Sequence, residues 1–411
     1  MSNEKVRRLD GGEREVIRQV EEMLQRSGWL NEYYGLSGWA EGEGGGEQCG
    51  VEIAGDRVVG LVVRYCGLEA LPENVGDLQE LRYLDVRGNR LEALPASLGQ
   101  LRHLHTLIVD HNRLTTLPES LGKLERLTAL HADGNRLSRF PTRLCRLPAL
   151  ETLQLYGNQL QELPSEIGQL AQLKNLSVGK NQLTTLPEAL WQLRRLQVLN
   201  VAENQLSALS EGIGQLSQLH TLDLAHNALN ELPDSLGQLT NLEAYLYLSN
   251  NRLTTLKPAL FERLDKLTYL NLTDNQLQEL PDTIGKLASL RELRIYNNQL
   301  KTLPTSLGKL SQLQELHVMN NRLATLPESL GGLARLRIMD LRNNQLQELP
   351  APIGQLENLV QLDLRANRLV ALPPQLERLP KLEKLDLRWL KLVAEPDWLS
   401  RLQRRGCVVL K

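Results

Sequence analysis

Two aspartates and two neighbouring histidines in the first half of the chain have side chains that can ligate a metal ion. Asp110 and Asp133 are 23 residues apart, and His111 and His131 lie within two residues of them. Carboxylate and imidazole groups bind divalent transition metals. His111 lies one residue further along its expected strand than Asp110, so the four groups need not converge. Two interpretations stay open: a metal- or small-ligand-binding cluster with Asp110, His131 and Asp133 as ligands, or solvated charges that interact with nearby arginines.

Catalytic chemistry is not indicated by the sequence. Cys66, Cys145 and Cys407 stand in apolar or terminal segments, and no Ser/His/Asp or Cys/His combination has a supporting motif. The glycine-rich stretch 41–46, EGEGGG, lacks the GK[ST] ending of a phosphate-binding loop. We therefore expect neither enzyme activity nor a cofactor.

Aromatic residues make up only 4% of the chain, so a local cluster of them needs an explanation. Tyr245, Tyr247 and Tyr269 are such a cluster, and Arg294 and His317 follow at the same recurring positions. Tyrosine and arginine dominate interface hot spots because each offers a large contact area with a polar tip. The sequence therefore predicts a protein-binding surface. Its predicted residues are Tyr156, Tyr245, Tyr247, Tyr269, Arg294, Tyr296, His317, Met319, Arg342, Arg365 and Arg388.

The last three residues of this predicted surface form a basic row. Each arginine follows an aspartate by two residues, so the row is partly self-neutralised and gives little reason to expect an acidic partner. The three aspartates are Asp340, Asp363 and Asp386.

These side chains are positioned by a repeat that runs through most of the chain. The unit written as residues 78–100, LQELRYLDVRGNRLEALPASLGQ, recurs with small changes, and one asparagine marks each copy. Intervals between the asparagines are 23 residues, except for two of 24 that end at Asn251 and Asn275. A fixed period in this range is the mark of a solenoid. The asparagines are Asn89, Asn112, Asn135, Asn158, Asn181, Asn204, Asn227, Asn251, Asn275, Asn298, Asn321, Asn344 and Asn367.

The pattern LxxLxxLxLxxNxLxxLP resembles the leucine-rich repeat family, in the 23-residue type of bacterial proteins and of intracellular Ras-group-like proteins. The resemblance covers about four-fifths of the chain. It implies an α/β solenoid shaped like a horseshoe and a function in binding other proteins. Plant-type members also begin with a hairpin like the run QCGVEIAGDRVVGLVV, although the second cysteine that often pairs there is not at the matching position.

We expect about fifteen coils, each with a short strand, a polar bend and a convex segment. In each LxL triplet, such as Leu84-Asp85-Val86, the two apolar side chains point inward and the middle one points out. Stacked strands then form a parallel sheet on the concave face. The asparagine amide is predicted to satisfy backbone groups at the bend. The LP step favours extended or 3-10 segments on the convex side.

Both ends of the chain differ from the repeat. We predict an N-terminal cap at 1–56, the solenoid at 57–396 and a C-terminal cap at 397–411. The first cap should contain a helix at 13–27 and a strand hairpin, because a terminal coil exposes leucines that need cover. A cluster of four aromatic residues and one leucine is predicted to pack over that open end. It consists of Trp29, Leu30, Tyr33, Tyr34 and Trp39.

Charge and composition narrow the classes of partner. The net charge is −2, which argues against nonspecific binding of nucleic acid or an anionic membrane because both need a basic face; a local basic patch stays open. No stretch reaches 18 apolar residues, so no membrane span is expected. The start of the chain lacks an apolar signal segment, and the four cysteines are scattered. We expect a monomeric cytoplasmic scaffold, adaptor or sensor that binds a protein through its concave face. A secreted bacterial effector, delivered into a host cell to recognise a host protein, is the alternative.

Overall fold

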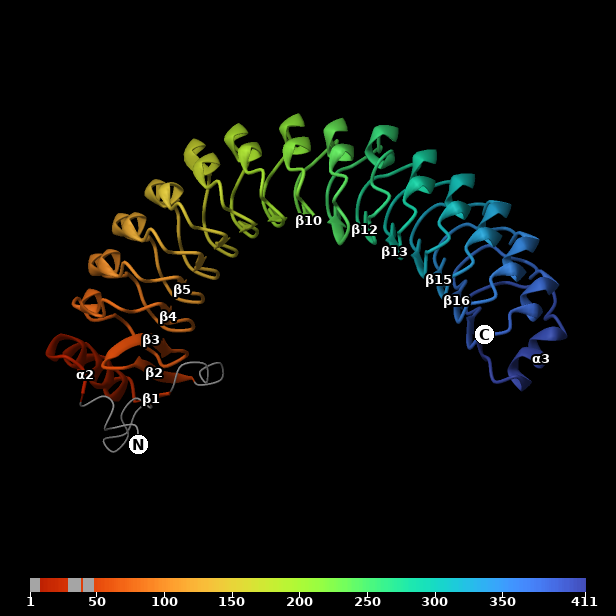
Figure 1. Ribbon diagram of the computed structural model, residues 1–411. Coiled ribbons are helices and arrows are strands. Elements are labelled where there is room, and N and C mark those ends of the chain that lie inside the picture. Colours follow the sequence, from red (N-terminus) through yellow and green to blue (C-terminus); the bar gives the residue numbers. More distant parts are fainter. Residues whose placement is uncertain (1–7, 29–37, 40–47) are drawn as a thin grey trace. The chain divides into compact units, whose positions relative to one another are not determined.

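The protein is described by a computed structural model that covers residues 8–28, the backbone of 38–39, and 48–411. The chain divides into two compact units, Met1–Asn204 and Gln205–Lys411. In each unit the chain winds through successive coils, with short strands along one side and 3-10 turns along the other (Figure 1). None of the helices in the described part has the length and apolarity needed to cross a membrane.

The first unit begins with a helix and an antiparallel hairpin and continues as parallel strands. Its α-helix is α2 (Gly11–Arg26), and β2 pairs antiparallel with β3 before β3 pairs parallel with β4. The strands are β1 (Gly38–Trp39), β2 (Cys49–Ala54), β3 (Arg57–Val63), β4 (Tyr83–Asp85), β5 (Thr106–Ile108), β6 (Ala129–His131), β7 (Thr152–Gln154), β8 (Asn175–Ser177) and β9 (Val198–Asn200). The 3-10 turns are η1 (Val75–Asp77), η2 (Ala96–Gln100), η3 (Glu119–Lys123), η4 (Thr142–Arg146), η5 (Ser165–Gln169) and η6 (Glu188–Gln192).

The second unit repeats the same coil and ends with a short helix and a strand. The strands are β10 (Thr221–Asp223), β11 (Tyr245–Tyr247), β12 (Tyr269–Asn271), β13 (Glu292–Arg294), β14 (Glu315–His317), β15 (Ile338–Asp340), β16 (Gln361–Asp363), β17 (Lys384–Asp386) and β18 (Val408–Leu410). The helices are η7 (Glu211–Gln215), η8 (Asp234–Gln238), η9 (Pro258–Phe261), η10 (Asp282–Lys286), η11 (Thr305–Lys309), η12 (Glu328–Gly332), η13 (Ala351–Gln355), η14 (Pro374–Arg378) and the α-helix α3 (Trp398–Arg404).

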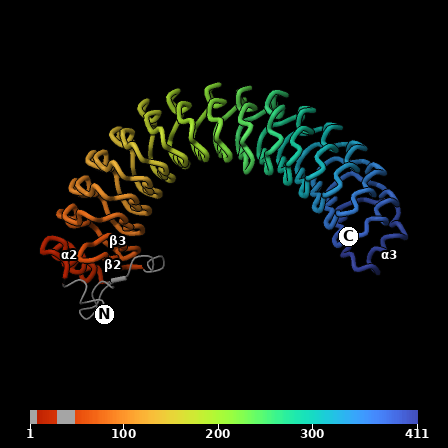
Figure 2. The backbone as a smooth tube through the Cα atoms, viewed as in Figure 1, coloured from red at the N-terminus to blue at the C-terminus, as the bar shows by residue number. Residues whose placement is uncertain are grey.

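The expected coil architecture is confirmed, with one shift in the strand bounds. Within each of the two units, Figure 2 shows successive coils stacked side by side. Leu84 and Val86 are fully buried as predicted, but β4 begins at Tyr83, one residue before the LxL triplet. The convex segments are 3-10 turns, most of which start directly after the proline of the LP step. Strands of only three residues suffice for a stable coil because buried leucines from every coil fill the interior.

The repeated asparagine closes the bend of each coil, as predicted. Asn112 donates from Nδ2 to the carbonyls of Val86 and Val109, both at 3.0 Å. Its Oδ1 accepts from the backbone N–H of Leu91 at 3.1 Å. One side chain therefore joins two neighbouring coils and satisfies backbone groups that are out of reach of water.

The residue before each ladder asparagine adopts a left-handed backbone, a requirement that the sequence reasoning missed. Its φ angle lies between 51° and 70° in all thirteen described coils that carry the asparagine. Glycine, asparagine and aspartate tolerate this conformation better than other residues. The positions are Gly88, His111, Gly134, Gly157, Lys180, Glu203, His226, Asn250, Asp274, Asn297, Asn320, Asn343 and Ala366.

The two 24-residue intervals leave the strand register intact. Tyr245 pairs with Thr221 and with Tyr269, at the same position of consecutive strands. The first extra residue falls in the bend directly before β11, and η9 in the next coil has four residues where most turns have five. Both insertions are therefore absorbed outside the sheet.

The N-terminal segment contains the predicted helix and hairpin, with the helix at Gly11–Arg26 instead of 13–27. Val16, Ile17, Val20 and Leu24 form the buried face of α2, and Leu399 and Leu402 are buried on α3. The division into 1–56, 57–396 and 397–411 stays a prediction. The proposed aromatic cover at Trp29, Leu30, Tyr33 and Tyr34, the Trp39 side chain and the 41–46 loop lie outside the described residues.

A buried carboxylate attaches α2 to the hairpin, and the sequence reasoning missed it. Glu13 is fully buried, accepts from the backbone N–H of Val58 at 3.0 Å, and lies 2.9 Å from the Arg57 guanidinium. Burial raises the pKa of Glu13, and the Val58 N–H and Arg57 oppose that change. The ion pair compensates part of the desolvation of the buried charge.

Candidate functional site

The outward strand positions of the second unit bring side chains of consecutive coils into columns. In an extended strand the first and third residues point to the same face. One column holds Tyr245, Tyr269, Glu292 and Glu315 in register. The adjacent column holds Tyr247, Asn271, Arg294 and His317 in register. Residues predicted from the sequence to cluster in β11–β14 therefore share one surface.

Three tyrosines on β11 and β12 pack against one another; we call them the tyrosine patch. The ring centroids of Tyr245 and Tyr269 are 5.6 Å apart, and those of Tyr247 and Tyr269 are 5.1 Å apart. The Arg294 guanidinium carbon lies 5.9 Å from the centre of the Tyr269 ring. Burial raises the pKa of Tyr269 to about 12, which Arg294 opposes. The patch is thus a preformed aromatic surface.

Exposure differs between members of the patch. Tyr245 is 46% exposed, whereas Tyr247 and Tyr269 are half-buried. Tyr296 and Met319 lie two residues beyond the ends of β13 and β14 and are also half-buried. Within the described residues, ring contacts join the three patch tyrosines and do not extend to Tyr296.

The basic row is paired with its aspartates, as the sequence suggested. Arg342 lies 3.4 Å from Asp340, and Arg365 lies 2.6 Å from Asp363. Asp386 is almost fully buried and contacts both Arg365, at 3.2 Å, and Arg388, at 2.7 Å. The arginines therefore present a surface of largely compensated charge.

Trp389 is an exposed aromatic residue that the sequence reasoning did not single out. Its side chain is 72% exposed, its φ is 65°, and the Arg388 guanidinium carbon lies 5.9 Å from its ring centre. Its position in the repeat could have drawn attention to it. Trp389 directly precedes Leu390, which occupies the position of the next ladder asparagine.

Tyr156 belongs to the first unit, whereas the other residues of the predicted surface belong to the second. Its hydroxyl donates to Glu203, and its backbone N–H donates to Asp133 Oδ1 at 2.6 Å. Its membership of the binding surface stays a prediction.

The predicted metal cluster of the first unit does not converge. Asp110 Oδ1 accepts from the backbone N–H of Asp133 at 2.8 Å, and Asp133 in turn accepts from Tyr156. His111 has the left-handed backbone of the residue before the ladder asparagine, which displaces it from the strand. The ligand atoms of Asp110, His131 and Asp133 do not all lie within 4.8 Å of one another. The carboxylates instead cap backbone groups of the next coil.

Burial governs the electrostatics of this acidic pair. Burial raises the pKa of Asp133 to about 6, with backbone hydrogen bonding from Tyr156 opposing and Asp110 adding to the rise. Burial also raises the pKa of Asp110 and lowers that of His131. Each charged form is disfavoured because solvation is lost.

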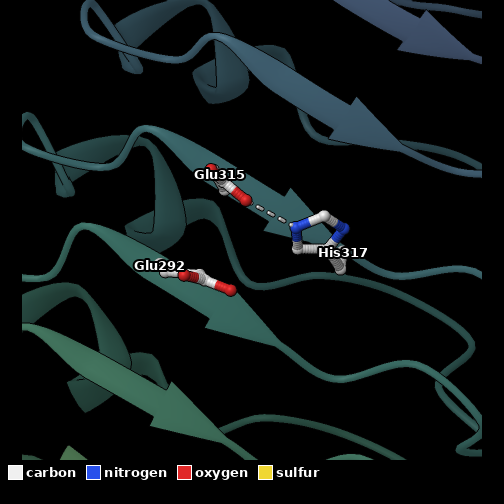
Figure 3. Close-up of side chains that lie close together, drawn as sticks. All are labelled: Glu292, Glu315 and His317. Carbon is white, nitrogen blue, oxygen red and sulfur yellow. Dashed lines mark hydrogen bonds and ion pairs between the residues drawn. The ribbon is translucent and has the colours of Figure 1, made fainter.

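A different group brings metal-ligating atoms together. Among the described residues, one set of three or more histidine, cysteine or acidic side chains has ligand atoms within 4.8 Å of one another. It consists of Glu292, Glu315 and His317 (Figure 3). His317 was predicted to bind a protein, whereas the two glutamates were not singled out from the sequence.

Comparison with known proteins identifies the family. Models described as leucine-rich repeat region or leucine-rich repeat match residues 66–158, 148–206, 218–239, 244–300, 288–346 and 334–392. These matches cover more than half of the chain. The protein therefore belongs to the leucine-rich repeat family.

Solved structures agree with this assignment. A leucine-rich repeat protein of Leptospira interrogans is 34% identical, with a TM-score of 0.78 over 85% of this chain and 94% of that one. The plant peptide hormone receptor RGFR1, solved in complex with RGF2, is 27% identical, with a TM-score of 0.65 over 83% of this chain and 64% of that one. An internalin of Listeria monocytogenes, 24% identical, with a TM-score of 0.65 over 74% and 89%, shows the fold alone. No curated protein matches the sequence.

Members of this family generally act as protein-interaction scaffolds, and the fold is typically non-enzymatic. The particular surface and partner depend on the outward side chains.

Proposed function

We propose that the protein binds a partner polypeptide through the strand face of its second unit, with the tyrosine patch and Arg294 at the centre. The observation that carries the proposal is the packing of Tyr245, Tyr247 and Tyr269 into one preformed cluster in a chain with few aromatics. A packed ring loses little conformational freedom on binding, because its neighbours already hold it.

The surroundings of the patch favour a polypeptide ligand. Phenol hydroxyls and the Arg294 guanidinium are hydrogen-bond donors for backbone carbonyls, and the ring faces accept apolar side chains. Tyr296, His317 and Met319 extend this mixed surface, and the row Arg342, Arg365 and Arg388 continues it. Peptide binding by the similar plant receptor RGFR1 is consistent with such a ligand.

The proposal is tested by selecting displayed peptides and proteins on the immobilised full chain and measuring their affinity for variants. Replacing Tyr269 by Ala should weaken the selected ligands by roughly thirtyfold or more, the effect of losing a hot-spot residue of about 2 kcal/mol. Tyr245→Ala should weaken them less, because its ring is the most exposed of the three.

Ile338→Ala supplies the matched control. Ile338 is the first residue of β15, the position that Tyr245 and Tyr269 occupy in their own strands, and it is half-buried. Its loss should leave affinity within about twofold of wild type, since peripheral contacts contribute little. Ligands that bind Tyr269→Ala and wild type equally well would place the binding surface elsewhere.

A further inference from the structure

The group Glu292, Glu315 and His317 is assembled from two neighbouring strands by the register of the sheet. Glu315 and His317 are the first and third residues of β14, so they project from the same face. Glu292 is the first residue of β13 and pairs in register with Glu315. Figure 3 shows Glu315 directed toward the His317 ring, with Glu292 on the adjacent strand.

The spacing of these side chains suits a small cation. Glu315 Oε2 lies 3.0 Å from His317 Nε2, and one ligand atom from each of the three residues lies within 4.8 Å of the others. Ligands at about 2.0–2.2 Å from a tetrahedral metal stand roughly 3.5 Å apart. Small side-chain rotations on an otherwise fixed sheet are therefore enough to close the site. All three residues are half-buried, which weakens competition from water.

Charges from the surrounding strands determine what a cation would have to displace. Arg294 forms an ion pair with Glu292 and also contacts the Tyr269 ring. A metal ion bound to Glu292 would replace this ion pair. Arg294 would keep its cation–π contact with the Tyr269 ring.

The strand on the other side adds a further carboxylate. Asp340 on β15 pairs in register with His317 and interacts electrostatically with it. Burial and the neighbouring Asp363 raise the pKa of Asp340, whereas Arg342 and His317 oppose the rise. A carboxylate beside a ligating histidine helps to orient the ring and increases its basicity.

We propose that Glu292, Glu315 and His317 bind a divalent transition-metal ion, with Zn²⁺ as the best match. One imidazole nitrogen and two carboxylate oxygens form a three-ligand set that leaves the fourth tetrahedral position open. Mg²⁺ and Ca²⁺ prefer oxygen ligands and higher coordination numbers, so they should bind more weakly. The site adjoins the tyrosine patch but does not depend on that patch binding a protein.

Isothermal titration of the metal-stripped full chain with ZnCl2, MnCl2 and MgCl2 tests the proposal. Wild type should bind one Zn²⁺ at this site more tightly than Mn²⁺ and show no comparable binding of Mg²⁺. His317→Ala and Glu315→Gln should each weaken Zn²⁺ binding by roughly tenfold or more, since each removes or neutralises a ligand. Circular dichroism melts without metal verify that the variants remain folded.

His131→Ala is the matched control. His131 is the third residue of β6, as His317 is of β14, and it stands among the acidic residues that do not converge. Its loss should leave Zn²⁺ affinity unchanged. Equal affinity in His317→Ala and wild type, or a loss confined to His131→Ala, would overturn the proposal, as would the lack of saturable binding by wild type.

X-ray absorption at the zinc edge gives a second readout that does not depend on the variants. The four buried cysteines are the strongest competing ligands in the chain. The proposal requires a coordination shell of nitrogen and oxygen, with an imidazole contribution that disappears in His317→Ala. Sulfur coordination would instead assign the bound metal to the cysteines and reject the site.

Discussion

At the scale of single residues, the asparagine of each coil performs a structural task that a leucine interior makes necessary. The bend after each strand leaves backbone groups pointing inward, where no water reaches them. Asn275 satisfies such groups through Nδ2, which donates to Leu248 O at 2.9 Å and Leu272 O at 3.1 Å. Its Oδ1 accepts from the Leu253 N–H at 3.0 Å. With a further bond from Nδ2 to Thr273 O at 3.2 Å, four backbone groups in two coils depend on one side chain.

Replacing Asn275 by Ala should therefore lower the free energy of unfolding by about 1–3 kcal/mol, because buried donors and acceptors lose their partner. Urea titration followed by circular dichroism measures the change. Gln276→Ala, next to it and exposed, is the control and should stay within about 0.5 kcal/mol of wild type. Equal effects of the two substitutions would contradict a structural ladder.

Asp133 offers a pH-dependent test of burial. Its pKa is raised from 3.8 to about 6 in the folded chain, so the folded state binds a proton more tightly than the unfolded state. The stabilisation by that proton is complete below pH 4 and lost as pH rises through 6. Asp133→Asn keeps an oxygen for the Tyr156 N–H and removes the charge. It should raise stability by about 1–2 kcal/mol at pH 7.5, after allowance for solvent screening.

Thermal melts of Asp133→Asn and wild type at pH 4 and pH 7.5 measure this effect. The difference between them should shrink toward zero at pH 4. A difference that is the same at both pH values would show that the carboxylate is not the cause.

At the scale of elements, the repeat was sufficient to predict the strands, the 3-10 turns and the buried leucines, because their spacing is set by local geometry. The sequence did not reveal two features of the coil. One is the left-handed residue before each asparagine, and the other is the start of each strand one residue early, at Tyr83 in β4. The sequence also singled out Tyr296 and Met319, which lie two residues beyond the ends of β13 and β14. The convergence of Glu292, Glu315 and His317 depends on the register between two strands and on side-chain rotamers, which a single coil does not reveal.

The left-handed position also explains a second, exposed row of amides in the second unit. Asn343 Nδ2 donates to Asn320 Oδ1 at 2.8 Å, and Asn320 donates to Asn297 at 2.5 Å. The next coil has Ala366 at this position, with a φ of 52°. Alanine is strained there and offers no amide to continue the row.

Ala366→Asn should therefore raise the free energy of unfolding by about 0.5–1 kcal/mol, by relieving strain and adding a hydrogen bond to Asn343. Denaturant titration measures it. Ala366→Leu, which adds bulk without an amide, is the control and should not raise the free energy of unfolding. Equal stabilisation by both substitutions would point to simple burial of apolar surface instead.

At the scale of the whole molecule, most contacts join coils that are neighbours in sequence, so stability should be distributed locally. Each strand pairs with the strands of the adjacent coils, and the buried leucines recur in every coil. Solenoids of this kind behave as chains of coupled units in which a defect is felt most by its neighbours. Loss of stability at one coil should consequently fade with distance along the repeat.

Hydrogen exchange of Leu130→Ala and Leu316→Ala tests this locality. Both leucines are fully buried at the centres of β6 and β14, and each truncation should cost about 2–5 kcal/mol through the cavity it leaves. Leu130→Ala should accelerate amide exchange most in β5–β7 of the first unit, and Leu316→Ala most in β13–β15 of the second. Acceleration spread evenly over all strands by either variant would mean that the chain opens as one cooperative body. A graded loss centred on the substituted coil would mean that each coil is held chiefly by its two neighbours.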